Sequence, residues 1–192
     1  MLAIGNDIID LHDSSILEHT AQDEEWMRRH LTESEWLRLD GISDEQLRLL
    51  TFWKRFALKE ASSKAMTQLG HTVPFGSFTH FEVDVDQNQV LHCSGEVCFI
   101  HQIQATADWI HAVVSSKSAP DSKIVSEVHD ATKSLPQRLL EALRLYGCLD
   151  STFIQKDGIP QIVRKGEVFP VSFSHSGRFA AFCWLIKMKD EK

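Results

Sequence analysis

The chain has 192 residues, 43% of them hydrophobic, and a formal net charge of −7. This length suits one ordinary domain or two small ones and is enough to bury a sizeable core. No apolar run of about 18 residues occurs, which argues against a membrane-spanning helix, and no basic segment of the signal-peptide type precedes the first apolar residues.

Charge is distributed unevenly along the chain. Residues 1–118 carry a net charge of −9 and residues 119–192 a net charge of +2. Nucleic-acid binding, which needs a strong basic stripe interleaved with aromatic residues, is not indicated. The pattern fits a cleft with carboxylates for a cation on one side and a polyanion on the other, although ordinary surface variation produces it equally well. The four scattered cysteines predict reduced thiols in a cytoplasmic protein.

In chain order, the first part reads as a short strand, several helices and then more strands. An apolar strand is predicted over residues 2–10, and helices between about 14 and 70. Thr32 and Ser43 each open a Ser/Thr-x-x-Glu/Gln capping box, and a long helix begins near 47 or 51 and stops at Gly70. Strands are predicted next; they cover residues 81–86, 97–100 and 109–114, and a linker follows over 115–122.

The second part opens with a helix, and strands follow it. A helix over residues 136–146 precedes short strand segments at 153–154 and 161–163. A hairpin then pairs 168–173 with 179–186. Because each part is a helix followed by antiparallel strands, we predict an α+β fold of two related lobes that form a pseudo-dimer. Their expected ranges are 1–118 and 119–192, with the active site between them.

Three acidic and basic side chains in the first part are candidates for chemistry. Phe56, Glu60 and Lys64 share one face of the long helix. A Glu-Lys pair at this spacing is most often a solvated helix pair. Asp7 ends a buried-type strand, where a carboxylate is costly unless it caps, pairs or binds a cation. Asp7 and Glu60 together suit Mg²⁺ if the strand end lies against the helix.

Further candidates follow from charge and position. Lys64 could reach phosphate oxygens as a point charge, and Glu60 could act as general base on a hydroxyl. Ser174 and His175 precede a Ser-Gly turn, where a hydroxyl, an imidazole and turn amides can converge on an anion. Asp10 is expected to cap or support rather than to bind metal.

The other histidines and the cysteines have no metal-ligand spacing. Cys93 and Cys98 lack a second Cys/His pair, and Trp26, Trp36 and Trp53 are expected in the core. No role is assigned to eight histidines: His12, His30, His71, His80, His92, His101, His111 and His129.

Taken together, three segments resemble the 4′-phosphopantetheinyl transferase superfamily: Gly5-x-Asp7-Ile8, Lys59-Glu60-Ala61-x-x-Lys64-Ala65, and Val171-Ser172-Phe173-Ser174-His175-Ser176-Gly177. Those enzymes use Mg²⁺ to move the phosphopantetheine arm of coenzyme A onto a serine of an acyl or peptidyl carrier protein. The resemblance implies that Asp7 and Glu60 hold Mg²⁺ and that Glu60 is also the base. It further implies that Lys64, Ser174 and His175 contact the phosphates of coenzyme A.

The chain departs from the family pattern at three points. The Ser-His-Ser-Gly segment follows the Lys-Glu segment, whereas it comes first in the two-lobe type. The short holo-acyl-carrier-protein-synthase type has the present order but consists of smaller, trimeric chains. We therefore expect a monomer whose two lobes have a permuted order. Ile9 stands where the two-lobe type has a carboxylate, and Gly158-Ile159-Pro160 lacks the usual lysine, for which Lys156 or Lys165 could substitute.

These features predict an active transferase of the holo-acyl-carrier-protein-synthase kind, releasing 3′,5′-ADP. The alternative is a non-catalytic module of the same fold that binds coenzyme A or a carrier protein. The expected partners are coenzyme A and an acidic apo carrier protein, with no nucleic acid and no membrane. Carrier docking is expected near two basic clusters, Arg28-Arg29 and Lys54-Arg55, and should weaken with salt.

Overall fold

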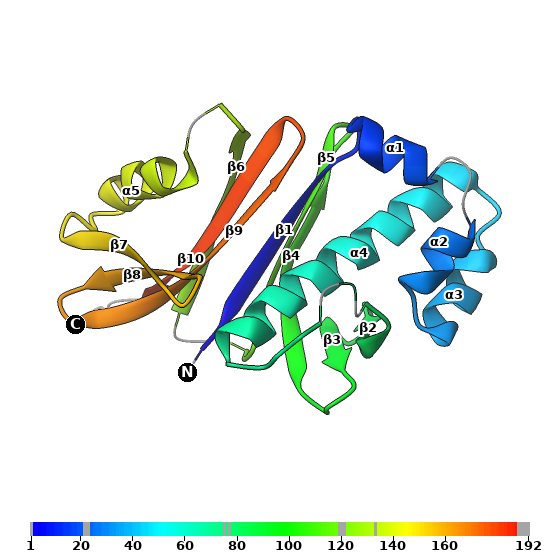
Figure 1. The fold of residues 1–192 in the computed structure, drawn as a ribbon, viewed down its shortest axis with the longest axis horizontal. Coiled ribbons are helices and arrows are strands. Elements are labelled where there is room, and N and C mark those ends of the chain that lie inside the picture. The colour runs from blue at the N-terminus through cyan, green and yellow to red at the C-terminus, as the bar shows by residue number, and fades with distance from the viewer. Residues whose placement is uncertain are drawn as a thin grey trace.

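Two antiparallel five-stranded sheets, each accompanied by helices, make up the computed structural model (Figure 1). It describes residues 2–20, 24–74, 76, 78–118, 122–132 and 134–187. The first sheet has the order β1-β5-β4-β3-β2 and consists of β1 (Ile4–Asp10), β2 (Phe81–Asp84), β3 (Gln89–His92), β4 (Val97–Ala105) and β5 (Trp109–Ser115). The second has the order β6-β10-β9-β8-β7 and consists of β6 (Ser122–Asp130), β7 (Ser151–Lys156), β8 (Ile159–Arg164), β9 (Glu167–Ser176) and β10 (Phe179–Lys187).

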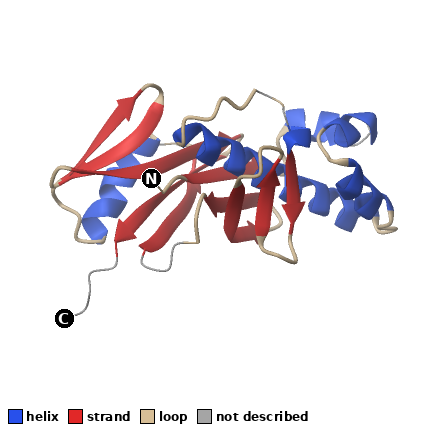
Figure 2. Ribbon diagram, turned by 90° about the horizontal axis from the view of Figure 1, so that it is seen from below, coloured by secondary structure: helices blue, strands red, loops and turns tan. Residues whose placement is uncertain are grey.

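The helices are divided unequally between the sheets. Four α-helices and a 3-10 turn accompany the first sheet: α1 (Ser14–Thr20), α2 (Glu24–Arg29), α3 (Glu33–Asp40), α4 (Glu45–Gln68) and η1 (Phe78–His80). One helix, α5 (Leu135–Leu145), accompanies the second. The short helices α1 to α3 lie at the end of the molecule opposite α5 (Figure 1, Figure 2). Within the described residues, no helix has the length and apolarity needed to cross a membrane.

The two halves have the same topology. In each, an edge strand is followed by helical structure (α1 to α4 in the first half, α5 in the second) and then by four strands, and the corresponding strands take the same order in their sheets. We call these halves the first lobe (the first sheet with α1 to α4) and the second lobe (the second sheet with α5). The prediction of an α+β fold with two related lobes is confirmed. The expected boundary at 118/119 stays a prediction, because residues 119–121 lie outside the described residues, as does that part of the predicted linker.

Local signals explain where the helices begin and end. The capping box at Thr32 is confirmed: its hydroxyl accepts from the Glu35 amide at 3.3 Å, and the Glu35 carboxylate accepts from the Thr32 amide at 2.8 Å. The box predicted at Ser43 is wrong, because Asp44 caps α4 by accepting from the Leu47 amide at 2.9 Å. An Asp side chain one residue closer to the helix satisfies that amide directly.

Two strands escaped the sequence prediction. β3 has four residues, and β6 carries polar residues over much of its length, so neither shows the apolar pattern that identifies a strand. Both are held by pairing with stronger neighbours, β3 between β2 and β4 and β6 along β10. Their identity therefore depends on sheet pairing rather than on local periodicity.

Each lobe has its own apolar core, and a small third cluster joins them. Trp53 is buried in the core of the first lobe, with Trp26 and Trp36 packed against it, as predicted. The joining cluster contains buried side chains from both sheets: Ile4, Val113, Cys183 and Leu185. The four cysteines are free thiols, and Cys93 alone is exposed. The lobes are therefore packed together directly across β1 and β10.

A buried ion pair joins α4 to α3. The Lys59 ammonium lies 2.5 Å from the Glu35 carboxylate and 3.0 Å from the His30 carbonyl oxygen, and the side chains of Lys59 and Glu35 are both fully buried. The other Glu35 oxygen accepts from the Val83 amide at 2.9 Å. One carboxylate thus connects α3, α4 and β2.

Strand β1 lies so close to α4 that only glycine fits at position 5. A Cβ atom on Gly5 would stand 1.8 Å from the carbonyl oxygen of Ala61. We expect Gly5→Ala to lower the free energy of unfolding by about 3 kcal/mol, because the helix must move away from the strand. Urea denaturation measures this. Gly41→Ala is the matched control, since its nearest neighbours stand at 3.7 Å; equal stability of the two variants would contradict the close contact.

Candidate active site

The two lobes meet along the free edge of β1, where β9 lies against it; we call this contact the seam. Because β1 is an edge strand of its sheet, alternate backbone amides point away from β5 and toward β9. Serine hydroxyls of β9 accept from them: Ser172 from Asn6, Ser174 from Ile8 and Ser176 from Asp10, each at 3.0 Å. The seam is therefore a fixed register of hydrogen bonds and not a loose contact between two domains.

Asp7 lies on this seam with its carboxylate held from both lobes. Its Oδ1 atom accepts from the Lys64 ammonium of α4 at 2.9 Å and from the Ser174 hydroxyl of β9 at 2.8 Å. Lys64 also donates to the Asn6 carbonyl oxygen at 3.0 Å. Asp7 is 8% exposed. Among the described residues no hydrogen bond reaches its other oxygen, Oδ2, which remains available to a ligand.

Glu60 shares a hollow with Asp7 and His175. This hollow has a volume of about 320 Å³. Within the described part of the chain no hydrogen bond or ion pair is formed by the Glu60 carboxylate. Burial raises the pKa of Glu60, the negative charge of Asp7 raises it further, and Lys64 opposes both. The remaining lining residues are largely apolar and come from β1, α1, α2, α4 and β9: Ile8, Ile9, Ser15, Ile16, Trp26, Trp53, Phe56 and Ser176.

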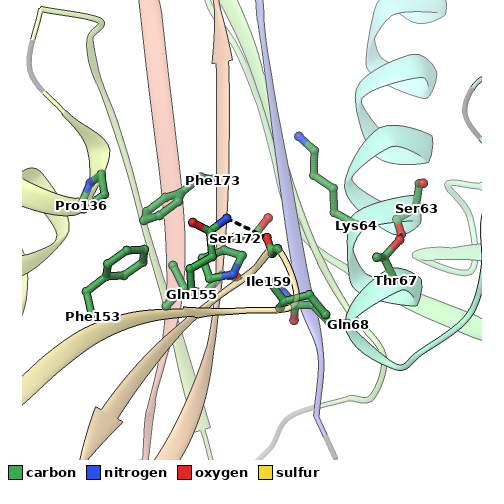
Figure 3. Close-up of a pocket in the computed structure, with 13 residues that line it drawn as sticks. Ser63, Lys64, Thr67, Gln68, Pro136, Phe153, Gln155, Ile159, Ser172 and Phe173 are labelled. Carbon is green, nitrogen blue, oxygen red and sulfur yellow. Dashed lines mark hydrogen bonds between the residues drawn. The ribbon is translucent and has the colours of Figure 1, made fainter.

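A second, larger cavity of about 440 Å³ lies between α4 and the second lobe (Figure 3). Its α4 wall is polar and includes Lys64 and Gln68, whereas its other wall carries apolar side chains. Phe153 and Phe173 face each other there with ring centroids 5.6 Å apart. The complete lining is Ser63, Lys64, Thr67, Gln68, Pro136, Phe153, Gln155, Gly158, Ile159, Pro160, Val171, Ser172 and Phe173. Lys64 therefore borders this cavity while its ammonium bonds Asp7.

All five predicted site residues lie at the seam, but in different settings. Asp7, Glu60 and His175 line one hollow, and Lys64 lines the adjoining cavity. His175 is exposed. Ser174 is buried, and its hydroxyl already bonds Ile8 and Asp7. The contact between Ser174 and a phosphate stays a prediction. In this structure the Ser174 hydroxyl holds the Asp7 carboxylate in place.

Several seam residues were not singled out from the sequence. Gln68 accepts from the Ile4 amide at 3.0 Å and donates to the Val171 carbonyl oxygen at 2.8 Å, so it joins both lobes. The serines at every second position of β9 were the available signal for these hydrogen bonds, because every second side chain of a strand points to the same face. Nothing local marks Gln68, because its partners are 64 and 103 residues away.

Asp10 has the supporting role expected of it. The Arg178 guanidinium donates to both of its carboxylate oxygens, at 2.9 and 2.8 Å, and the Arg178 amide donates at 2.9 Å. These bonds hold the pKa of the buried Asp10 carboxyl well below its usual range. A carboxylate engaged in this way closes the β9–β10 turn against the end of β1.

A family model of the 4′-phosphopantetheinyl transferase superfamily matches residues 3–123. The chain belongs to this superfamily. The match includes β1 and α4, and with them Asp7, Glu60 and Lys64, and it ends within β6. No match was found among curated proteins. Membership makes the protein a transferase of the phosphopantetheinyl class.

For this phosphopantetheinyl transferase relative, Ser174 gives a direct test of the seam. Ser174→Ala removes an acceptor from the Ile8 amide and a donor from Asp7, so we expect a loss of about 1–3 kcal/mol in the free energy of unfolding. Urea denaturation measures this. Ser176→Ala removes only the acceptor of the Asp10 amide. Transfer activity should fall in Ser174→Ala alone; an equal fall in both would contradict a specific action on Asp7.

Proposed function

We propose that this chain is a Mg²⁺-dependent 4′-phosphopantetheinyl transferase with holo-acyl-carrier-protein-synthase activity. It transfers the phosphopantetheine arm of coenzyme A to a serine of an apo acyl or peptidyl carrier protein and releases 3′,5′-ADP. One observation carries the proposal: the buried carboxylate of Asp7, the half-buried carboxylate of Glu60 and a lysine meet on the seam between the lobes, beside a cavity large enough for part of a cofactor-sized molecule. We place the active site between residues 1–118 and 119–192.

The donor set fits a hard divalent cation. Glu60 and Asp7 repel each other in a partly buried setting, and Glu60 has no cationic partner bonded to it among the described residues. Mg²⁺ prefers carboxylate oxygens, water and substrate phosphates, so Asp7 and Glu60 would hold it. When bound, the ion neutralises phosphate charge and acts as a Lewis acid on phosphoryl oxygen. Asp7 can offer Oδ2 while Oδ1 keeps its bonds to Lys64 and Ser174.

The remaining residues supply binding and proton transfer. Lys64 lies where its ammonium can stabilise the phosphates of coenzyme A, and His175 approaches the same seam from the second lobe. The carrier serine oxygen forms a bond to the β-phosphorus while the bond to the 3′,5′-ADP oxygen breaks. Glu60, with its raised pKa, accepts the hydroxyl proton. The apolar wall with Phe153 and Phe173 would cover the uncharged parts of coenzyme A.

A non-catalytic binding module is the second candidate. It would use the same cavity for coenzyme A but would not need two carboxylates that repel each other. Burial and the negative charge of Asp7 make the ionised form of Glu60 costly, and Lys64 offsets this cost only in part. This cost favours the catalytic proposal.

The carrier-docking prediction needs one correction. Arg55 is buried and donates to the Glu35 carbonyl oxygen at 3.4 Å, so it cannot contact a partner. Arg28 and Arg29 have exposed side chains that form ion pairs with Glu33 and Glu25. We therefore propose docking of an acidic carrier along Arg28, Arg29 and Lys54.

The experiment is a transfer assay. The full chain is incubated with an apo carrier protein, coenzyme A and Mg²⁺, and the carrier is weighed by mass spectrometry. We expect the mass of one phosphopantetheine on the carrier serine, and no gain when a chelator removes Mg²⁺. Binding of coenzyme A with no gain on any of several carriers would instead favour the binding module.

A further inference from the structure

Two histidines and a cysteine meet at the open end of the β2–β3 hairpin, away from its turn. They are His80 at the end of η1, His92 at the end of β3, and Cys93, the residue that follows. Their ligand atoms all lie within 4.8 Å of one another. We propose that these three side chains bind Zn²⁺ or a similar transition-metal ion, at a site separate from the Mg²⁺ carboxylates.

Backbone pairing fixes the three residues. Phe81 is paired with His92 across the β2–β3 ladder, and the Cys93 amide donates to the His80 carbonyl oxygen at 2.8 Å. The His92 amide donates to the Glu96 carbonyl oxygen at 2.9 Å, which closes the following turn. The cluster is thus assembled by the strand register and not by chance approach of flexible side chains.

A polar relay orients the central histidine. The Nδ1 atom of His92 lies 2.5 Å from the Ser94 hydroxyl and accepts from the Ser94 amide at 3.3 Å, and the hydroxyl donates to the Glu96 carboxylate. The Nε2 atom of His92 therefore points toward Cys93 and lies 3.9 Å from its sulfur. The second ring nitrogen of a zinc-bound histidine is commonly hydrogen-bonded to a neighbouring polar group, which fixes the orientation of the ring, and Ser94 holds the His92 ring in a comparable way.

The ligand types suit a tetrahedral ion, and small rotations of the side chains would bring all three ligand atoms to its bond lengths. Zinc bonds to sulfur and to imidazole nitrogen are about 2.3 and 2.0–2.1 Å long, so a separation of 3.9 Å can be bridged by one ion at a bent angle. Thiolate and imidazole favour Zn²⁺ over Mg²⁺. On binding, the Cys93 thiol releases its proton to solvent as the metal–sulfur bond forms. Water can complete the fourth position, because His80 and Cys93 are exposed.

The site is independent of the proposed active site. None of the three ligands lines the hollow of Asp7 and Glu60 or the cavity beside Lys64. The cluster cannot be recognised from sequence spacing, because the hairpin brings His80 next to residues that are 12 and 13 positions further along the chain. No local motif therefore marks His80, His92 and Cys93 in the sequence.

Cobalt substitution tests the proposal on the full-length chain. Titration with Co²⁺ should give a thiolate-to-metal charge-transfer band in the near ultraviolet, complete at one equivalent. Cys93→Ser should remove the band, which identifies the sulfur because the other three cysteines are buried. His80→Ala and His92→Ala should each weaken binding at least tenfold, and Ser94→Ala about tenfold. His12→Gln, at an exposed histidine in the turn between β1 and α1, is the control and should leave binding unchanged.

Thiol modification supplies a second readout. Zn²⁺ should slow the reaction of Cys93 with a maleimide in the wild type and not in His92→Ala. An absent band in the wild type, a band that persists in Cys93→Ser, or equal affinity in the histidine variants would overturn the proposal. The transfer assay in Mg²⁺ does not depend on these outcomes, so the two proposals fail separately.

Discussion

Replacing Glu60 by glutamine should lower phosphopantetheinyl transfer by about 100- to 10,000-fold, because this residue is both a proposed metal ligand and the proposed base. Glutamine keeps the shape of the side chain and removes its charge, so the fold should be retained. Single-turnover transfer to an apo carrier protein measures the rate. Glu45→Gln, at the exposed start of the same helix, is the matched control and should transfer at the wild-type rate.

The same variant has a predictable effect on stability. Because the folded-state pKa of Glu60 is raised above its ordinary value of 4.5, the folded protein holds this proton more tightly than the unfolded chain does. The ionised Glu60 therefore destabilises the fold above its folded pKa, and this penalty disappears below about pH 4.5. Glu60→Gln should match or exceed the wild-type melting temperature at pH 8, with a difference that shrinks toward acid pH. A melting temperature below that of the wild type at pH 8 would contradict the proposed repulsion.

Replacing the neighbouring Lys59 by methionine should instead lower the stability of the fold. Breaking a buried ion pair leaves an uncompensated charge, here on Glu35, and costs about 3–5 kcal/mol. Urea denaturation measures the loss. Lys54→Met, on the same helix but partly exposed, should change the free energy of unfolding by no more than about 0.5 kcal/mol. A similarly small loss in Lys59→Met would show that the pair does not hold α3 and β2 on α4.

A double variant separates the contribution of the Lys59–Glu35 ion pair from that of the other hydrogen bonds of Glu35. Glu35→Gln in the Lys59→Met background removes the uncompensated charge, so part of the loss should be recovered. Recovery is incomplete because Glu35 also accepts from the amides of Thr32 and Val83. Adjacent residues of the Lys-Glu motif thus have divided roles, since successive helical side chains point about 100° apart. Lys59 stabilises the fold, and Glu60 faces the seam.

Patterns within single elements were read correctly from the sequence. The apolar run of β1, the cap at Thr32, the stop of α4 near Gly70 and the β9–β10 hairpin are each encoded within a few neighbouring residues. Asp7, Glu60 and Lys64 were proposed as site residues from their charge and position and from the family resemblance, and their roles stay predictions. Their meeting depends on Gly5, which lets β1 approach α4, and that contact is visible only in three dimensions.

Features that depend on distant pairing were missed. β3 and β6 are short or polar strands that become strands through their neighbours. The serines of β9 meet amides of β1 that are 166 residues away, and the hairpin register assembles His80, His92 and Cys93. In each case neither partner stands out within its own segment, so no pattern within one segment predicts the contact.

The most direct test of the seam as a catalytic site is the transfer rate as a function of Mg²⁺ concentration, measured side by side for the wild type, Asp7→Asn and Glu60→Gln. We predict saturation in the wild type, with both variants slow at every concentration while they stay folded. A wild-type rate that does not depend on Mg²⁺, or variants as fast as the wild type, would contradict the assignment of Asp7 and Glu60.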